Sequence, residues 1–460
     1  MNLSIIHLLL FSFSLSADTM RFAFTIFRHG ARSPYNEMTP DFKDWFGYQW
    51  SGVKELTAVG LRQHYLLGYR NRYYYSEVYD LLPKAPYKFD PREILVMSTD
   101  SNRTLLSANA QIQGLFQAGQ GPSLTESQIK TAVPPNDEST YKEEKEALGS
   151  DSLPNKMFVL PVHTFFTRDH YIQLQDKKVC PGVKEIYQKN EEREVVKTFL
   201  KELSDKYGAK LAELTGQSNS TFLMNYTRAY SVLDAIIAIY TDGRDMTKFT
   251  DKGIDVQDLL DYCFKFFVLD FVGNGEGHDE IGLIAMSPIF RQVLNWMDNK
   301  IQHDIKGEFD YIGYDTPKYV MYSAHDSTVG AFESFIKAVF NKTIIYAKFA
   351  ANGQLELLRD PKTQGLSEKD FKVQYVFNDD VIFTIPYNEF KTTVEGKLKT
   401  AEQIADFCKF PTESKGTNYN AYMIVTIVLG VIALILIGIV VHIFMNKPPT
   451  HNLIPNDDKV

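Results

Sequence analysis

Two arginines and a histidine stand close together near the start of the chain, in the segment RHGARSP at residues 28–34. The guanidinium group of arginine presents a rigid fork of N–H donors that matches the oxygens of a phosphate. Histidine is a nitrogen nucleophile that is neutral near pH 7 and needs no separate base to deprotonate it. The spacing R-H-G-x-R-x-P arises by chance in on the order of one in ten thousand chains of this length. Arg28, His29 and Arg32 therefore predict phosphate chemistry through a phosphohistidine.

Two further polar groups follow short apolar segments later in the chain. Arg103 comes after the apolar segment 94–97, and the pair His325-Asp326 comes after the apolar segment 319–323. Because parallel strands present their carboxyl ends at one edge of a sheet, we expect the polar groups that follow these strands to meet in one crevice. The groups expected to converge are Arg28, His29, Arg32, Arg103, His325 and Asp326.

These side chains form a consistent set for phosphoryl transfer. Three guanidinium groups spread stabilisation over the equatorial oxygens of the transferring group, and they keep His29 neutral at mildly acidic pH. A carboxylic acid beside the phosphate can protonate a leaving alkoxide. The arginines supply the charge that a metal ion would supply, and the histidines lack the spacing of metal ligands. The sequence therefore predicts a site with no metal and no other cofactor.

The elements that position these residues alternate between strand and helix patterns, which predicts an α/β fold with a mainly parallel sheet flanked by helices. The strand Phe22–Phe27 is followed by a helix that starts after the N-cap Thr57, and the strand Ile94–Met97 by a helix over Arg103–Phe116. Further strands are predicted at Phe158–Val162, Tyr319–Ser323, Ile344–Ala350, Gln354–Leu358, Lys372–Phe377 and Val381–Thr384. Residues from about 185 to 302 predict a helical subdomain inserted into the sheet domain, and residues 117–156 a solvated surface insertion.

The two ends of the chain predict a membrane protein with one span. A short apolar stretch followed by small residues predicts a signal peptide at 1–17. Residues 422–444 contain no Asp, Glu, Lys or Arg, and this length matches a hydrocarbon core of about 30 Å. We therefore expect a lumenal domain at 18–416, a transmembrane helix at 422–444 and a cytosolic tail at 445–460. This single-pass type I topology fits a lysosome, an endosome or the cell surface.

The composition and net charge of the chain limit the classes of molecule that it can bind. The chain has 460 residues, 44% of them hydrophobic, which is ample for a large globular core. Its net charge is -8 and it has no long basic run, so nucleic acid is excluded as a partner. The expected partners are small phosphomonoester substrates and the membrane. The sequence leaves monomer and homodimer both open.

At the residues described above, the chain resembles the histidine acid phosphatases, of the lysosomal and prostatic type within the phosphoglycerate-mutase-like superfamily. The likeness lies in RHGARSP at 28–34, LTAVGLRQHYLLG at 56–68, STDSNRTLLSA at 98–108, LPVHT at 160–164 and MYSAHDST at 321–328. It runs through nearly all of the expected lumenal domain in the same order as in the family. It implies a phosphoglycerate mutase-like fold and an acid phosphatase that acts on phosphomonoesters.

The resemblance also implies a role for each residue of the site. His29 would be the nucleophile that attacks phosphorus, and Asp326 the proton donor to the leaving group. The phosphoryl oxygens would be bound by Arg28, Arg32, Arg103 and His325. The chain has three cysteines, and two of them, Cys180 and Cys408, match cysteines of the family, which implies a disulfide between them.

Glycosylation sequons at Asn219, Asn225 and Asn341 suit a lumenal protein. The sequon at Asn102 adjoins Arg103, so a glycan there would block the site.

Two other functions remain as alternatives. A phytase or inositol-polyphosphate phosphatase shares the same core residues, but its pocket needs extra Lys and Arg to meet several phosphates. Residues 35–38, directly after RHGARSP, supply none. A catalytically silent surface receptor on the same scaffold is disfavoured because all six predicted site residues are intact.

Overall fold

The structure is a computed structural model, and it describes residues 18–410 apart from short gaps. The gaps are residues 36–47, 49, 51, 85–86, 88–89, 91, 135–140, 165–172, 272–277, 343–345 and 363. The predicted signal peptide, the predicted membrane span and the predicted tail lie outside the described residues. Within the described part, no helix is both long enough and apolar enough to cross a membrane.

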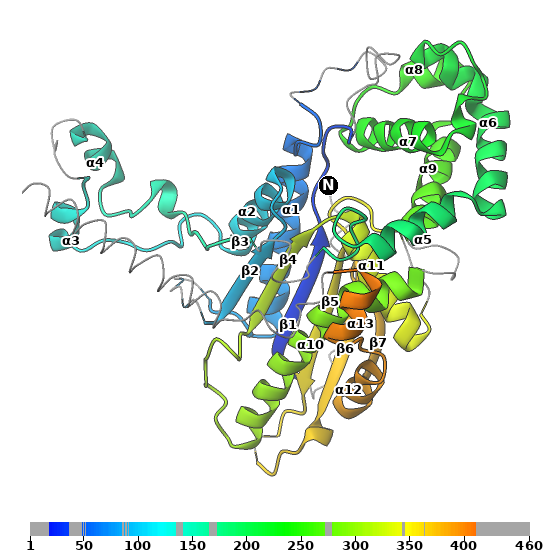
Figure 1. The fold of residues 1–460 in the computed structure, drawn as a ribbon. Helices are drawn as coiled ribbons and strands as arrows, with labels where there is room; N and C mark the ends of the chain where they lie inside the picture. Colours follow the sequence, from blue (N-terminus) through cyan, green and yellow to red (C-terminus); the bar gives the residue numbers. More distant parts are fainter. Residues whose placement is uncertain are drawn as a thin grey trace, which may run out of the picture. The chain divides into compact units, whose positions relative to one another are not determined.

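A seven-stranded mixed sheet lies at the centre of the described residues, with the strand order β3-β2-β4-β1-β5-β6-β7 (Figure 1). The α/β class is confirmed, but the expectation of a mainly parallel sheet is wrong. Three strand pairs are parallel, from β3 to β1, and three are antiparallel, from β1 to β7. The strands are β1 (Thr19–Arg28), β2 (Ile94–Ser98), β3 (His163–Thr164), β4 (Tyr319–Ala324), β5 (Asn352–Arg359), β6 (Phe371–Phe377) and β7 (Asp380–Pro386).

The antiparallel pairing of β6 with β7 follows from the short connection between these two strands. Only Asn378 and Asp379 separate β6 from β7, with φ of 46° and 84°. Two left-handed residues make a tight hairpin turn, whereas a parallel pair needs a crossover of about a dozen residues or more. The short gap between the strands predicted at 372–377 and 381–384 therefore indicates an antiparallel pair from the sequence alone.

Strand β1 is buried on both faces, which explains its nearly continuous apolar run. On one face Phe22 contacts Trp296 of helix α10 (His278–Ile305), and Phe24 contacts Phe332 of helix α11 (Asp326–Phe340). On the other face Phe27 belongs to a core that helix α2 (Asn102–Leu115) completes. Helix α1 (Ala58–Arg72) packs along α2 and starts after the predicted N-cap, Thr57, whose side chain accepts from Gly60 N.

Two predicted strands are loops. The segment predicted at Phe158–Val162 precedes a β3 of two residues, and its Phe158 packs on the rings of Tyr87 and Phe116. Pro161 has no N–H for a sheet ladder. In the segment predicted at Ile344–Ala350, residues 346–350 form a loop, and residues 343–345 are not described. Phe158 and Leu160 in the first loop and Tyr346 and Phe349 in the second are buried by packing onto neighbouring elements and not by strand pairing, whereas Val159 is exposed.

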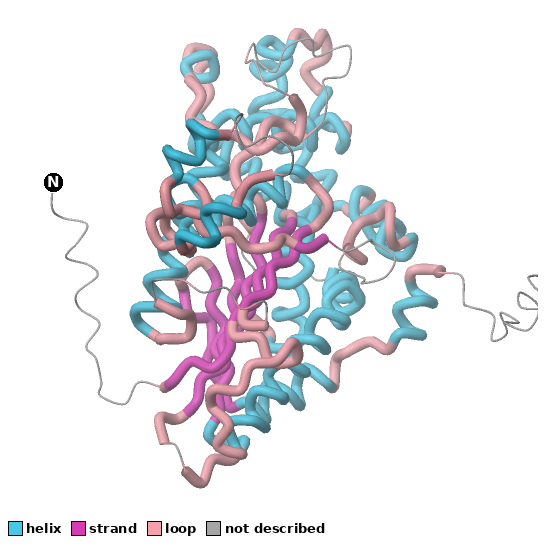
Figure 2. The backbone as a smooth tube through the Cα atoms, turned by 90° about the vertical axis from the view of Figure 1, so that its left-hand side faces the viewer, coloured by secondary structure: helices cyan, strands magenta, loops and turns pink. Residues whose placement is uncertain are grey.

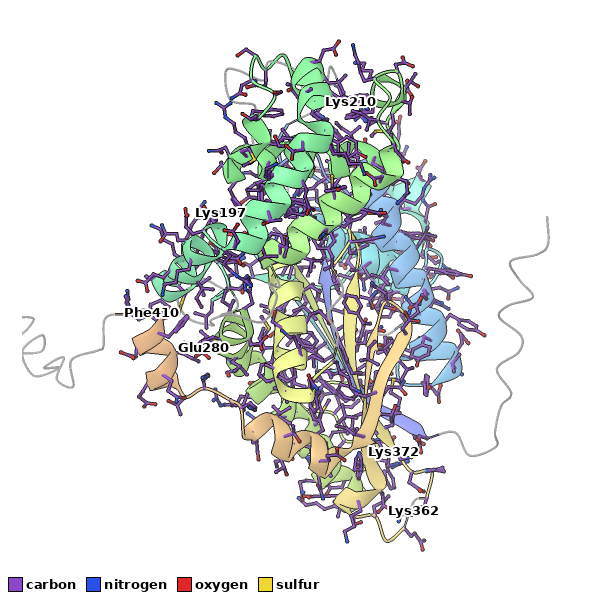
Figure 3. The ribbon with its side chains drawn as sticks, turned by 90° about the vertical axis from the view of Figure 1, so that its right-hand side faces the viewer. Lys197, Lys210, Glu280, Lys362, Lys372 and Phe410 are labelled. Carbon is purple, nitrogen blue, oxygen red and sulfur yellow. A yellow bond between two sulfur atoms is a disulfide. The ribbon has the colours of Figure 1, made fainter. Side chains whose placement is uncertain are left out.

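A helical subdomain lies beyond the carboxyl ends of the parallel strands (Figures 1 and 2). Its helices are α5 (Pro181–Glu191), α6 (Glu194–Thr215), α7 (Tyr226–Thr241), α8 (Thr247–Thr250) and α9 (Val256–Phe271). Buried apolar residues from Val196 to Phe267 form its core. Helix α10 packs instead on the sheet and on α11. Figure 3 shows Lys197 and Lys210 on the subdomain, at the end of the molecule opposite Lys362 and Lys372.

Apart from η4, whose Phe222 and Leu223 belong to the core of the subdomain, the remaining helices lie outside this core. Helices α3 (Glu126–Thr131) and α4 (Lys142–Leu148) bury no residue, in agreement with the predicted solvated insertion. Short turns of helix are η2 (Tyr73–Val78), η3 (Pro154–Lys156), η4 (Phe222–Met224) and η5 (Glu368–Asp370), and the chain closes with α12 (Tyr387–Glu395) and α13 (Ala401–Phe407). The implied disulfide between Cys180 and Cys408 is present, and Cys263 is free and buried.

Candidate active site

Three parallel strands bring the predicted site residues to one edge of the sheet. Strand β1 ends at Arg28, which is in register with Ala324 of β4, and His29 N donates to Ala324 O over 2.9 Å. Ser98 at the end of β2 is in register with Ser323 of β4. Arg103 and Asp326 lie in the first turns of the helices that follow, α2 and α11. The expected convergence of the six residues is therefore present.

The turn after β1 is held close to helix α1 by two glycines. A Cβ on Gly30 would lie 2.4 Å from Gly60 O, and a Cβ on Gly60 would lie 2.2 Å from Ala31 O. Thr57 N donates to Ala31 O over 2.9 Å. The glycine of the RHG motif therefore lets the backbone around His29 rest directly on the start of α1.

His29 is buried and its ring has a defined tautomer. Its Nδ1 lies 2.9 Å from Gly30 O, and a carbonyl only accepts, so Nδ1 bears the proton and Nε2 bears the free lone pair. Burial, reinforced by the charges of Arg103, Arg28 and Arg32, holds the pKa of His29 well below its ordinary value. The imidazole is thus a neutral nitrogen nucleophile.

Arg28 is held from three sides. Its Nη1 donates to Tyr346 Oη and to Ala347 O, each over 2.8 Å, and its Nη2 lies 2.7 Å from Asp326 Oδ2. Its guanidinium carbon lies 4.1 Å from the centre of the Phe349 ring. The loop that was predicted as a strand thus supplies the wall behind this arginine.

Arg32 is paired with a carboxylate of the helical subdomain. Its Nη1 and Nη2 donate to the two oxygens of Asp234 on α7, over 3.1 Å and 2.7 Å. Tyr35 N donates to the same carboxylate over 2.7 Å. Burial by itself would lower the pKa of Arg32, but the Asp234 carboxylate outweighs it and raises the pKa. Asp234 therefore fixes both the charge and the direction of Arg32.

Arg103 and His325 contact each other. Arg103 Nη2 lies 3.1 Å from His325 Nδ1, and because an arginine only donates, His325 Nδ1 accepts and its Nε2 bears the proton. His325 Nε2 lies 2.9 Å from Thr99 Oγ1. Burial and then the charge of Arg32 lower the pKa of Arg103 to about 10, and burial with the three arginines lowers the pKa of His325. Both groups contribute to the electropositive environment of His29.

The three arginines share one unusual feature. In each of Arg28, Arg32 and Arg103, the Nε–H is buried and has no hydrogen-bond partner among the residues that the structure describes. A buried N–H donor in a folded protein almost always has a hydrogen-bond partner. Several unpaired N–H donors around one histidine therefore indicate a binding site for an anion. In Arg32 the Nη1 and Nη2 groups bind Asp234, and the Nε–H is not used by this ion pair.

Asp326 is the first residue of α11. Its Oδ1 accepts from Ser327 N over 2.9 Å, and its other oxygen meets Arg28. The helix N-terminus adds positive potential at this point. Asp326 lines the same cavity as His29, where it can exchange a proton with a group bound over the imidazole.

A cavity of about 450 Å³ opens above these residues. Its inner end is formed by His29, Arg32, Arg103, His325 and Asp326, and its outer wall by residues of the helical subdomain and of the segment before α5. Within the described residues, no group of three or more His, Cys, Asp or Glu side chains is arranged to hold a metal ion.

Sequence reasoning missed the residues that hold the arginines in place. Asp234 lies in an apolar helix far along the chain, and nothing local marks it as a partner of Arg32. Tyr35 and Phe349 each lie against two of the three arginines. Tyr346 and Phe349 were assigned to a strand because apolar runs of this length are typical of strands.

Removing the charge of Asp234 should loosen Arg32 without unfolding the protein. We expect Asp234→Asn to lower kcat/KM by about tenfold to a hundredfold and to weaken inhibition by inorganic phosphate, because Arg32 loses its bidentate partner. Asp242→Asn is the matched control, since Asp242 ends the same helix and pairs with Arg244 outside the cavity. If phosphate inhibition is unchanged in Asp234→Asn, Asp234 does not position Arg32 for the phosphate.

Comparison with known proteins places the chain in a family. The sequence model of the Histidine phosphatase superfamily (branch 2) matches residues 19–378, so the chain belongs to this family. The chain is 25% identical over 321 residues to prostatic acid phosphatase of Bos taurus, covering 69% of each chain. It is also 25% identical over 375 residues to testicular acid phosphatase of Mus musculus, covering 81% of this chain and 76% of the relative. The predicted class, a phosphomonoester hydrolase of the acid phosphatase type, is confirmed.

Solved structures share the fold. The apo form of Hafnia alvei phytase superposes with a TM-score of 0.52 and 13% identity, covering 87% of this chain and 100% of the phytase. The same phytase in complex with myo-inositol hexakis sulphate gives a TM-score of 0.53 at 13% identity, with 84% and 99% covered. At this identity the likeness establishes the fold and leaves the substrate to be argued from the cavity.

Proposed function

We propose that this protein hydrolyses small phosphomonoesters in two steps through a phosphohistidine at His29. The observation that supports this most is a set of three buried arginine Nε–H groups, without a partner among the described residues, around a histidine whose Nε2 has a free lone pair. Such donors bind the equatorial oxygens of a phosphoryl group, and the lone pair attacks phosphorus from the side opposite the leaving group. His325, which was also predicted to bind the phosphate, has its two ring nitrogens in contact with Arg103 and Thr99, so it would contact the phosphate by exchanging its hydrogen bond with Thr99.

In the first step, His29 Nε2 forms a bond to phosphorus while the ester P–O bond breaks. Asp326 gives its proton to the departing alkoxide, which leaves as the free alcohol. In the second step, water attacks phosphorus, the P–N bond breaks, and the Asp326 carboxylate takes up the proton of the water. Inorganic phosphate is released and both side chains return to their starting states.

The ion pair between Arg28 and Asp326 is compatible with a role for Asp326 as the proton donor. A phosphate dianion bound beside Asp326 competes for Arg28 and adds a like charge, and both effects favour the protonated acid. The proton needed for the leaving group is then present when a substrate is bound.

A phytase reading is the second candidate, because the solved structures that share the fold are phytases. A phytate pocket must neutralise several phosphates at once. Beyond the arginines at the inner end, the described residues of the cavity wall include one lysine, Lys177, against the carboxylates of Asp100, Asp176, Glu191 and Asp270. This wall repels additional phosphates, so we favour monophosphate esters.

The protein should work better in acid than at neutral pH. The pKa of His29 lies well below its ordinary value, so mild acid favours the neutral nucleophile more than it would for an ordinary imidazole, while a more acidic solution favours donation of a proton to the leaving group. We expect kcat/KM for an aryl phosphate to be higher near pH 5 than near pH 7, and phytate to be a poor substrate at both. The measurement is phosphate release from a panel of phosphomonoesters, phytate and lysophosphatidate between about pH 4 and pH 8.

An activity that falls from about pH 7 to pH 5 along the titration curve of an ordinary imidazole would contradict this assignment of His29. Phytate turnover that equals the turnover of the best monophosphate would support the second candidate.

We also propose that the catalytic domain, at 18–416, is lumenal or extracellular and is anchored by a helix at 422–444, after removal of a signal peptide at 1–17. The apolar ends of the sequence, the disulfide and the exposed sequon residues Asn219, Asn225 and Asn341 support this topology. The full chain should resist alkaline extraction from membranes, and a chain ending at residue 416 should be secreted. Release of the full chain by alkali would contradict the anchor.

A further inference from the structure

The outer wall of the cavity has side chains that the phosphoryl transfer does not use. Among the residues that the structure describes, the carboxylates of Asp176, Glu191 and Asp270 line it together with one lysine, Lys177. Its charge is therefore opposite in sign to that of the arginine end. A ligand that spans the cavity would meet positive charge at its phosphate and negative charge at its other end.

Aromatic rings stand among these carboxylates. Tyr187, Tyr226 and Tyr230 line the cavity, and the hydroxyl of Tyr226 donates to Asp270 Oδ1. Tyr187 is buried, and burial raises the pKa of its hydroxyl, so this ring stays neutral. Electron-rich rings beside carboxylates attract a cation and offer little to an anion.

A buried amide oxygen adds a specific requirement for a donor. Gln175 is 2% exposed and lines the cavity, and its Nε2 donates to Thr328 Oγ1 over 2.9 Å. Its Oε1 is buried and has no partner within the described part of the chain. A buried amide oxygen calls for an N–H or O–H, and a ligand in the cavity is placed to provide one.

We propose that this wall is a subsite for the alcohol part of the substrate, and that it selects phosphomonoesters whose alcohol bears a primary ammonium group. The three N–H donors of an ammonium match Gln175 Oε1 and the carboxylates, and its charge suits the tyrosine rings. The inference rests on the proposed phosphatase function and specifies its substrate class. A neutral aromatic alcohol would contact the rings but would give Gln175 Oε1 no N–H donor and the carboxylates no cation.

The pH of the assay matters for this wall. Burial raises the pKa of Asp270 to about 7, and it also raises the pKa of Glu191. The groups that act on Asp270 are Tyr226, Lys177, Asp326 and Glu191. The wall therefore has more negative charge near pH 7 than in acid, and selectivity for an ammonium ester is best measured there.

The test compares two esters of equal size, phosphoethanolamine and n-propyl phosphate, which differ in an ammonium against a methyl group. We expect the wild type to prefer phosphoethanolamine by about tenfold in kcat/KM near pH 7. Glu191→Gln should lower this preference about threefold, and Lys177→Met should raise it. Glu192→Gln is the matched control, because the neighbouring Glu192 pairs with Lys197 and does not line the cavity.

The inference is overturned if kcat/KM of the wild type for phosphoethanolamine does not exceed kcat/KM for n-propyl phosphate. It is also overturned if neither Glu191→Gln nor Lys177→Met changes the ratio of these two values. An aryl phosphate is assayed in parallel to separate this failure from a failure of the proposed function. If the aryl phosphate is hydrolysed while the ammonium ester is not preferred, the substrate class is wrong and the phosphatase assignment stands. If none of the three esters is hydrolysed, the proposed function fails and the substrate class with it.

Discussion

Replacement of His29 by alanine should lower the turnover of an aryl phosphate by about 10⁴-fold or more and leave the fold intact. The reaction depends on a nitrogen lone pair at the point where three arginines bind the phosphoryl group. His325 does not replace it, because Arg103 and Thr99 contact both of its ring nitrogens. Steady-state rates and rapid-quench labelling measure the effect: the wild type should form an acid-labile phosphoprotein, and the variant should form none.

The control for this variant is His303→Ala. His303 lies on α10, pairs with Glu308 and does not line the cavity, so its removal should leave turnover at the wild-type level. Circular dichroism and the melting temperature report whether each variant is folded. Robust hydrolysis by a folded His29→Ala protein would exclude the phosphohistidine mechanism.

Replacement of Asp326 by alanine should have the second largest effect, and this effect should depend on the leaving group. An alkoxide is a poor leaving group without a proton, so we expect alkyl phosphates to slow by about 10²–10⁴-fold. A nitrophenolate leaves readily without a proton, so nitrophenyl phosphate should slow by at most about tenfold. The measurement is the dependence of kcat/KM on the pKa of the leaving alcohol, which should be steeper in the variant.

Asp326→Asn separates the proton transfer from the contact with Arg28. An asparagine keeps a polar partner for Arg28 Nη2 but has no acidic proton to give. It should therefore show the same steep dependence on the leaving group as Asp326→Ala. Equal losses for alkyl and aryl esters in both variants would mean that Asp326 acts by holding Arg28 and not as the acid.

The residues expected to do chemistry were predictable because each group is local in the sequence. Arg28, His29 and Arg32 lie in one turn after one strand, and His325-Asp326 lies between β4 and α11. The N-cap Thr57 and the helix after β2 were predictable for the same reason, since capping and periodicity are local signals. The parallel order of the strands that end at the site then follows from their alternation with helices.

The residues that hold the arginines of the site in place could not be predicted from local sequence patterns. Asp234 is separated from Arg32 by 202 residues, and only the packing of α7 over the sheet brings the two together. Tyr346 and Phe349 look like strand residues, yet they lie in a loop behind Arg28. A buried carboxylate in an apolar helix has no local signature, because its partner is chosen by tertiary contact.

The sequence by itself thus determined the chemistry of this protein: an imidazole among arginines, an acid, and strands that end where these groups stand. These features depend on residue type and on spacing over a few bonds. The tertiary structure alone decided how the groups are aimed. The direction of Arg28, the direction of Arg32 and the charge of the outer wall all depend on atoms brought together from segments far apart in the chain. Burial makes these distant contacts decisive, since a charge or a donor removed from water must find its partner within the fold.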